Sequence, residues 1–84
     1  MKSKNVETKE TPDLYLAAFL RAAGCLMQGQ RTEDRRTFFI FEPNTDIPRL
    51  KADYFNGRAK VCPLDYAHNI RTLKSILHMG KKRK

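Results

Sequence analysis

Cysteine is scarce in this chain of 84 residues, which contains only Cys25 and Cys62. Small secreted domains usually contain several cysteines that pair as disulfides, so two distant ones favour a reducing compartment and a cytoplasmic location. Zinc sites are typically built on closely spaced cysteine pairs, which this chain lacks. His68 and His78 lie ten residues apart in one expected helix, which separates them by about three turns. We therefore expect no metal ion and no cofactor.

Glycine and long apolar runs are also scarce, and their absence excludes further classes of protein. The four glycines are isolated, whereas the loops that cradle phosphate groups in nucleotide-binding enzymes are rich in glycine. No segment approaches the roughly 20 apolar residues that a membrane span needs. The basic residues near the N-terminus are not followed by an apolar stretch. We therefore expect neither a signal peptide nor an association with membranes.

A catalytic site is not recognisable in the sequence. Cys62 and His68 could supply a nucleophile and a base, but no third orienting group or oxyanion hole can be identified for them. Cys62 stands at an expected helix start, where a thiol can gain reactivity, so a reactive role and a packing role both stay open. Asp13, Asp46 and Asp65 also stand near expected helix starts, where stabilising the helix explains them. A chain this short offers little scaffold for a catalytic cleft, so we expect a binding protein and not an enzyme.

Acidic residues are fewer than basic ones, and this imbalance is concentrated in one part of the chain. The chain has 9 Asp and Glu against 17 Lys and Arg, a formal net charge of +8. Residues 58–84 hold eight of the basic residues against Asp65 alone, whereas residues 1–57 are almost balanced. Such asymmetry favours an anionic partner, either nucleic acid or an acidic protein surface, although a solvated tail that aids solubility is the alternative. The candidate nucleic-acid-binding residues are Arg58, Lys60, Arg71, Lys74, Lys81, Lys82, Arg83 and Lys84.

The apolar residues predict a single small α+β domain, in which an antiparallel hairpin packs against helices in the order α-β-β-α-(β)-α. Residues 11–24 predict the first helix, with Thr11 as its capping residue and Gly24 as its end. The apolar residues that recur there at helical spacing are Leu16, Phe19, Leu20 and Ala23. A stripe this wide is typical of a helix that is largely buried.

Residues 25–42 predict the hairpin, with a polar turn at 31–35. The four bulky residues Phe38–Phe41 make both faces of its second strand apolar. Either both faces are covered, or one of them exposes an aromatic patch that would permit a homodimer or a contact with another protein. The candidate interaction surface comprises Arg35, Arg36, Phe38 and Ile40.

Two more helices are expected after the hairpin. The first begins near Asp46 and ends at Gly57, and the second begins at Cys62 or the next residue and ends at Gly80. A short third strand at 58–61 is consistent with alternating polar and apolar residues, but its neighbours limit its length, so its formation stays open.

The expected domain spans residues 11–80, between a disordered arm at 1–10 and a basic tail at 81–84. Its apolar residues are sufficient for one small core. The expected core residues are Leu14, Leu16, Phe19, Leu20, Phe39, Phe41, Leu50, Phe55, Ile70, Leu73 and Leu77.

The segment Asp13–Leu20, followed by a hairpin that ends in Phe39–Glu42, resembles a small bacterial family of unknown function that opens with a DLYLAAFL-like helix. The segments Tyr54–Val61 and Leu73–Ser75 are similar to that family too, so the resemblance spans residues 11–78. It implies a compact α+β domain from a bacterium, a phage or a mobile element. It implies no activity, cofactor or catalytic residue.

Together these patterns predict a small accessory protein that binds nucleic acid through its basic C-terminal surface. Tyr54, Tyr66 or Phe38 could stack on the bases of a single strand, although residues at such spacings also occur in cores. The alternative is an interaction or inhibitory module of a phage or mobile element, which docks a larger protein through the aromatic hairpin.

Overall fold

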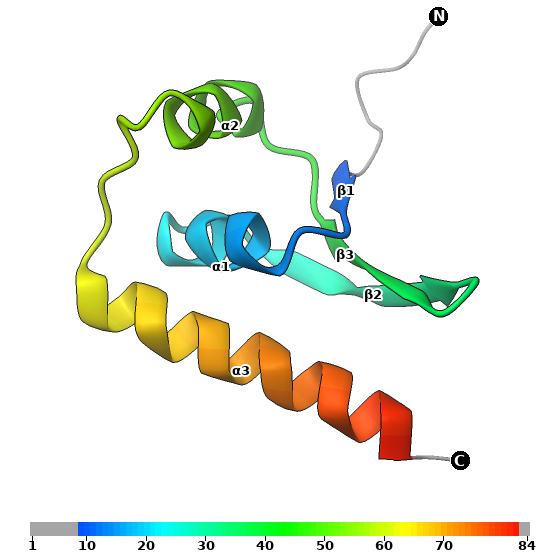
Figure 1. The fold of residues 1–84 in the computed structure, drawn as a ribbon. Helices are drawn as coiled ribbons and strands as arrows, with labels where there is room; N and C mark the ends of the chain where they lie inside the picture. Colours follow the sequence, from blue (N-terminus) through cyan, green and yellow to red (C-terminus); the bar gives the residue numbers. More distant parts are fainter. Residues whose placement is uncertain (1–8, 83–84) are drawn as a thin grey trace, which may run out of the picture.

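A computed structural model describes the backbone of residues 9–82 and the side chains of residues 9–78. Its strands are β1 (Lys9–Thr11), β2 (Met27–Glu33) and β3 (Arg36–Phe41). Its helices are α1 (Leu14–Ala22), α2 (Ile47–Phe55) and α3 (Pro63–Lys82). Figure 1 shows α1 between the other two helices, with the sheet at one side. This arrangement confirms the predicted fold class, a single small α+β domain.

The sheet has three antiparallel strands in the order β1-β3-β2, so the apolar strand β3 is central. Lys9 and Glu10, which the sequence assigns to a disordered arm, instead belong to β1 and pair with Phe41 and Ile40. The polar residues of β1 show no apolar periodicity that would predict a strand. Their strand conformation therefore depends on pairing with the edge of β3. Residues 58–61 form no strand and instead belong to the segment that joins α2 to α3.

The hairpin turn is tighter than the sequence predicts. Strand β2 continues to Glu33, which pairs with Arg36, and only Asp34 and Arg35 remain in the turn. Both turn residues have positive φ angles, 54° and 69°, as in a type I′ turn. That turn is favoured because its twist matches the right-handed twist of the two strands.

Helix α1 begins two residues later than expected. The carboxylate of Asp13 accepts hydrogen bonds from the backbone N–H groups of Tyr15 and Leu16, at 3.0 and 3.1 Å. Asp13 is therefore the N-cap, and such a cap is worth about 1 kcal/mol. Thr11 ends β1, and its hydroxyl accepts a hydrogen bond from the backbone of Asp13. Gly24 follows the helix with a φ of 101°, a conformation that glycine adopts without strain.

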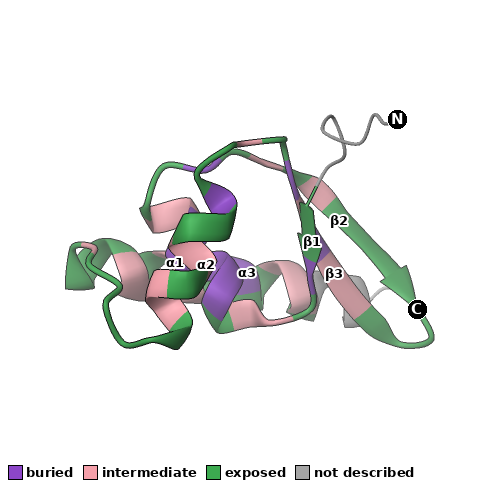
Figure 2. Cartoon of the chain, turned by 90° about the horizontal axis from the view of Figure 1, so that it is seen from above, coloured by how far each residue is buried: buried purple, intermediate pink, exposed green. Residues whose placement is uncertain are grey.

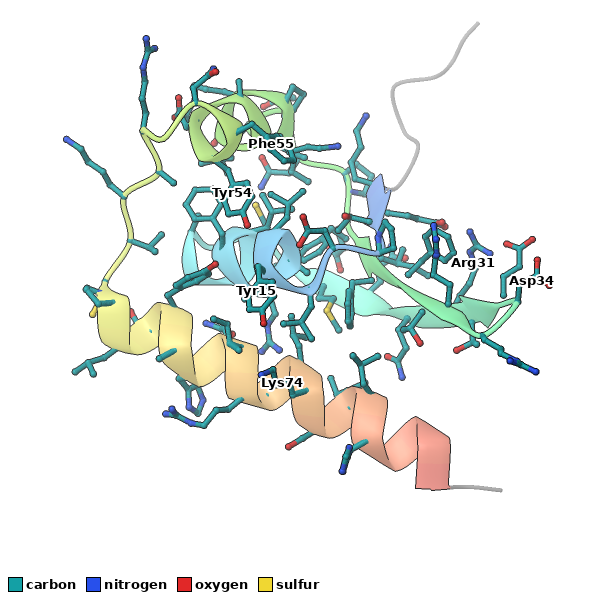
Figure 3. The ribbon with its side chains drawn as sticks, viewed as in Figure 1. Tyr15, Arg31, Asp34, Tyr54, Phe55 and Lys74 are labelled. Atoms are coloured by element: carbon teal, nitrogen blue, oxygen red, sulfur yellow. The ribbon has the colours of Figure 1, made fainter. Side chains whose placement is uncertain are left out.

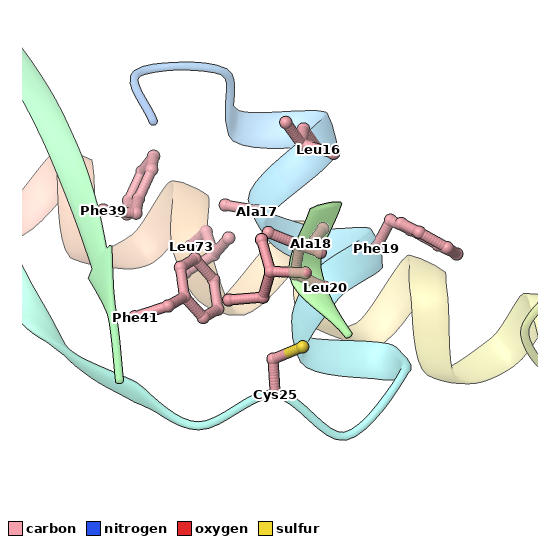
Figure 4. Packing of buried hydrophobic residues seen from close by; sticks show 10 residues of the cluster. Leu16, Ala17, Ala18, Phe19, Leu20, Cys25, Phe39, Phe41 and Leu73 are labelled. Atoms are coloured by element: carbon pink, nitrogen blue, oxygen red, sulfur yellow. The ribbon is translucent and has the colours of Figure 1, made fainter. Parts of the chain in front are cut away.

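The core lies between α1, α3 and the inner face of β3, as the burial colours in Figure 2 and the close-up in Figure 4 show. Alternation along β3 directs Phe39 and Phe41 inward, where they are 1% and 0% exposed. The prediction that Phe55 belongs to the core is wrong, because its side chain is 66% exposed at the end of α2. Ala17, Ala18, Cys25 and Ile47 are buried in the same core.

Helix α3 begins at Pro63, and the carbonyl oxygen of Cys62 accepts the hydrogen bond from Tyr66 that opens it. Leu73 is fully buried against α1, with Ile70 and Leu77 partly buried beside it, as the periodicity predicts. The helix continues to Lys82, so Gly80 does not end it. A glycine inside a helix costs only about 1 kcal/mol, so it ends a helix only where the chain must turn. Within residues 9–82 no helix combines the length and apolarity needed to cross a bilayer.

Candidate nucleic-acid interface

Two of the candidate basic residues, Arg71 and Lys74, lie on α3 and point away from the core. Both side chains are exposed, whereas Leu73 between them is buried. With His78 they follow the spacing i, i+3 and i+7, which places the three on one side of a helix. The position of Lys74 on this helix is labelled in Figure 3. The burial of Leu73 therefore fixes the direction in which these cations project.

Arg58 and Lys60 lie in the extended segment of residues 58–62 that joins α2 to α3, and both are exposed. A helix rises about 1.5 Å per residue, so Arg71 and Lys74 lie roughly 12 to 17 Å along α3 from its first residue. The linker leads directly into α3, so these four exposed cations lie along one continuous segment of the chain. We call this set of Arg58, Lys60, Arg71 and Lys74 the basic surface.

The described side chains include no ion pair that involves a member of the basic surface. The acid that lies between them in sequence, Asp65, is in the first turn of α3. By contrast, Arg49 on α2 lies 3.6 Å from both Asp46 and Asp53. Positive charge therefore accumulates along the linker and α3, where intramolecular acids do not neutralise it.

The four basic residues at the C-terminus are placed only in part. The backbone of Lys81 and Lys82 belongs to α3, and their side chains lie outside the described residues. Arg83 and Lys84 also lie outside the described residues. The predicted role of these four residues stays a prediction.

The hairpin places its candidate residues at the opposite end of the molecule from the linker of residues 58–62 (Figures 1 and 3). Arg35 and Arg36 are exposed at the tip. Phe38 and Ile40 are half-buried and alternate with the inward residues of β3, so they face away from the helices. The structure thus separates the hairpin residues from Arg58 and Lys60 of the linker.

Arg31 organises this outer face of the sheet, and sequence reasoning missed its role by assigning it to the turn. Its guanidinium lies 2.8 Å from a carboxylate oxygen of Glu10 on β1 and 2.6 Å from one of Glu33. It also lies over the ring of Phe38, 4.6 Å from the ring centroid. The hydrogen bond from Arg31 holds the pKa of Glu10 below its usual range. The aromatic patch is therefore partly covered by an ion cluster that links all three strands.

The cysteines and histidines remain apart in the structure. Cys25 is buried, and burial raises the pKa of its thiol, with the carboxylate of Asp46 adding to the effect. Cys62 is exposed at the start of α3, and His68 is exposed on the same helix. Among the side chains of residues 9–78, no three of His, Cys, Asp or Glu come close enough together to hold a metal ion.

A pocket of about 360 Å³ lies between α1, α2 and the start of α3. Phe19, Tyr54 and Tyr66 supply its aromatic wall, and the linker supplies the opposite wall. Burial, together with the neighbouring Tyr66 and Asp13, raises the pKa of Tyr54 to about 12, so this hydroxyl keeps its proton at neutral pH. The three rings come from three different helices, so no local sequence pattern signals the pocket.

Comparison with known proteins gives a family and no assigned activity. No curated protein and no solved structure matches the chain. A family described as Domain of unknown function (DUF5659) matches residues 7–79, which is most of the chain. The match includes five of the six helices and strands completely and most of α3. The chain therefore belongs to the DUF5659 family.

Proposed function

We propose that this chain is a small accessory protein, without enzymatic activity, that binds nucleic acid through the basic surface. The observation that carries the proposal is that four exposed cations along the linker and α3 lack acidic partners among the described side chains. Lys and Arg side chains bind phosphate oxygens, and each neutralised phosphate releases counterions. The C-terminal residues 81–84 would extend the same surface. The resemblance of Asp13–Leu20 to a bacterial family supports an origin in a bacterium, a phage or a mobile element.

The elongated shape of the basic surface supports binding along a phosphate backbone. Phosphates of one strand follow each other at about 3.4 Å along a duplex, so the roughly 17 Å of α3 between its first residue and Lys74 is long enough to pass several of them. The helical side chains Arg71 and Lys74 project from a rigid element, while Arg58 and Lys60 project from a linker. Such contacts position nucleic acid without reading its sequence.

Replacing Arg71 and Lys74 with alanine tests the proposal. We expect binding to duplex DNA at about 0.15 M salt to weaken by roughly 10- to 30-fold, since two phosphate contacts are lost. The slope of log affinity against log salt concentration should fall by about 1.8, at roughly 0.9 per phosphate. Fluorescence anisotropy titrations at several salt concentrations, with duplex DNA, single-stranded DNA and RNA, measure both quantities.

The matched control replaces Arg35 and Arg36 with alanine, which removes the same charge from the tip of the hairpin and leaves α3 unchanged. We expect this control to bind almost as tightly as the unchanged chain. Equal losses of affinity in the two variants would mean that net charge alone attracts nucleic acid. The proposal that the basic surface is the binding site would then be wrong. A variant with residues 81–84 changed to glutamine separates the contribution of the C-terminus.

The second candidate function is docking of a larger protein through the hairpin, and it rests on the geometry of Arg35. This arginine has a φ of 69°, a conformation in which glycine is the usual residue. An arginine held there at a cost in stability is consistent with a side chain that contacts a partner. Arg36, Phe38 and Ile40 lie next to it on β3 and would share in the contact with an acidic patch.

Replacing Arg35 with glycine tests that cost. We expect the free energy of unfolding to rise by about 0.5 to 1 kcal/mol, because relief of the left-handed conformation exceeds the extra entropy of glycine in the unfolded chain. Replacing Arg36 with glycine, in the extended strand next to it, should lower the stability instead. Urea unfolding monitored by circular dichroism compares the two variants. A loss of stability with Arg35→Gly would remove the argument for a retained arginine.

A further inference from the structure

The linker between α2 and α3 has two faces with different chemistry. Ala59 and Val61 of the linker, with Gly57 just before it and Pro63 just after it, line the pocket of about 360 Å³. The residues between them, Arg58, Lys60 and Cys62, are exposed. In an extended backbone successive side chains point to opposite sides, so the linker lines the pocket with one face and presents cations beside it with the other.

The opposite wall of the pocket is aromatic. Phe19 and Tyr54 are stacked, with ring centroids 5.6 Å apart and an angle of 30° between the ring planes. Tyr66 is anchored because its hydroxyl donates a hydrogen bond to the backbone carbonyl of Tyr15, at 3.4 Å. Tyr54 and Tyr66 are half-buried, so parts of both side chains remain accessible. The wall is thus held in place by α1, and it does not require a ligand to form.

The size and chemistry of the pocket indicate one class of ligand. A volume of about 360 Å³ is at the lower end of small-molecule pockets, which suits a single planar ring system. Aromatic walls bind nucleobases by stacking, and cations on the residues that alternate with the pocket-lining ones can bind the phosphates that flank a base. An apolar metabolite would leave Arg58 and Lys60 without a role, whereas a nucleotide uses both faces of the linker.

We propose that this pocket takes an unstacked base of single-stranded nucleic acid, while Arg58 and Lys60 bind the phosphates on either side of that base. This inference rests on the proposed nucleic-acid binding and deepens it, since it names single strands as the preferred class. A base in a duplex is paired and stacked, and entering the pocket would require its extrusion at a cost in free energy. The basic residues of α3 then bind the phosphates that follow along the strand.

The test compares a single-stranded oligothymidine with an abasic oligonucleotide of the same length and charge. We expect the unchanged chain to bind oligothymidine roughly 5- to 100-fold more tightly, as base–aromatic stacking predicts. Ala59→Leu places a larger side chain at the pocket wall and should abolish this preference while leaving affinity for the abasic strand unchanged. Anisotropy titrations of labelled strands measure all four affinities.

Ala52→Leu is the matched control, because it makes the same chemical change on the exposed side of α2 and does not line the pocket. This variant should keep the preference for bases. Both alanines are exposed, so both variants should retain the thermal unfolding midpoint of the unchanged chain. Arg58→Gln with Lys60→Gln should lower the salt slope by about 1.4 for both strands, at roughly 0.7 per phosphate of a single strand.

The outcomes separate this inference from the proposed function. Equal affinity for the two strands, or an unchanged preference in Ala59→Leu, would overturn the base pocket. If binding still weakened with salt and with loss of Arg71 and Lys74, the proposed nucleic-acid binding would stand without it. Tighter binding to duplex DNA than to oligothymidine would also overturn the pocket. Absence of binding to any nucleic acid would overturn both proposals.

Discussion

Replacing Phe41 with alanine is expected to lower the free energy of unfolding by about 3 to 5 kcal/mol. Its side chain is 0% exposed in the central strand, and alanine would leave a cavity between β3 and the helices. A chain of 84 residues typically has a total stability of roughly 4 to 13 kcal/mol. The variant should therefore unfold at much lower urea concentration, which circular dichroism measures.

Phe55→Ala is the matched control for this prediction, because the same side chain is removed from a position that is 66% exposed. Its ring contacts Tyr54 edge to face, with centroids 5.2 Å apart, so we expect a loss below about 1 kcal/mol. Comparable losses of stability in the two variants would contradict the buried position of Phe41 on β3 and the exposed position of Phe55 on α2. The comparison also tests the correction of the core, since periodicity alone places Phe55 inside.

Leu73→Ala is expected to lower the free energy of unfolding by about 2 to 5 kcal/mol. Leu73 is fully buried where α3 packs on α1, and these two helices share the largest helix–helix interface of the described chain. Loss of this contact weakens the attachment of the helix that presents Arg71 and Lys74. Hydrogen exchange should therefore become faster in α3, and the denaturation midpoint should shift at the same time.

Leu64→Ala, on the same helix, is the control for Leu73→Ala. Leu64 is 78% exposed, so its replacement should change the stability by no more than about 0.5 kcal/mol. A large loss with Leu64→Ala would show that the first turn of α3 packs against something that the described contacts do not include. Nucleic-acid affinity should remain unchanged in this variant, because the basic surface keeps its charge and its support.

Stability and binding are connected through α3 in this small protein. One stripe of the helix, centred on Leu73, forms part of the core, and the opposite side presents the cations. The linker that precedes it is similarly divided between residues that line the pocket and residues that do not. Most of the proposed recognition residues therefore lie next to core positions, so binding experiments need variants that change only the outward side chains.

The sequence by itself determined the features that depend on neighbouring residues. Helical spacing of apolar residues predicted α1 and α3, and Gly57 marked the end of α2. The bulky run Phe38–Phe41 predicted the strong strand of the hairpin. The concentration of positive charge after residue 57 is likewise a property of the sequence. Caps and helix ends were less accurate, because Thr11 and Asp13 are both suitable capping residues and only the pairing of β1 distinguishes them.

Only the tertiary structure decided which distant segments meet. The polar strand β1 forms because β3 offers it an edge, whereas residues 58–61 pair with no strand and stay irregular. The ion cluster around Arg31 depends on the strand pairing that places Glu10 of β1 and Phe38 of β3 beside it. The aromatic pocket depends on the packing of three helices and a linker. Local propensity cannot specify such contacts, because their free energy arises only when residues far apart in sequence are brought together.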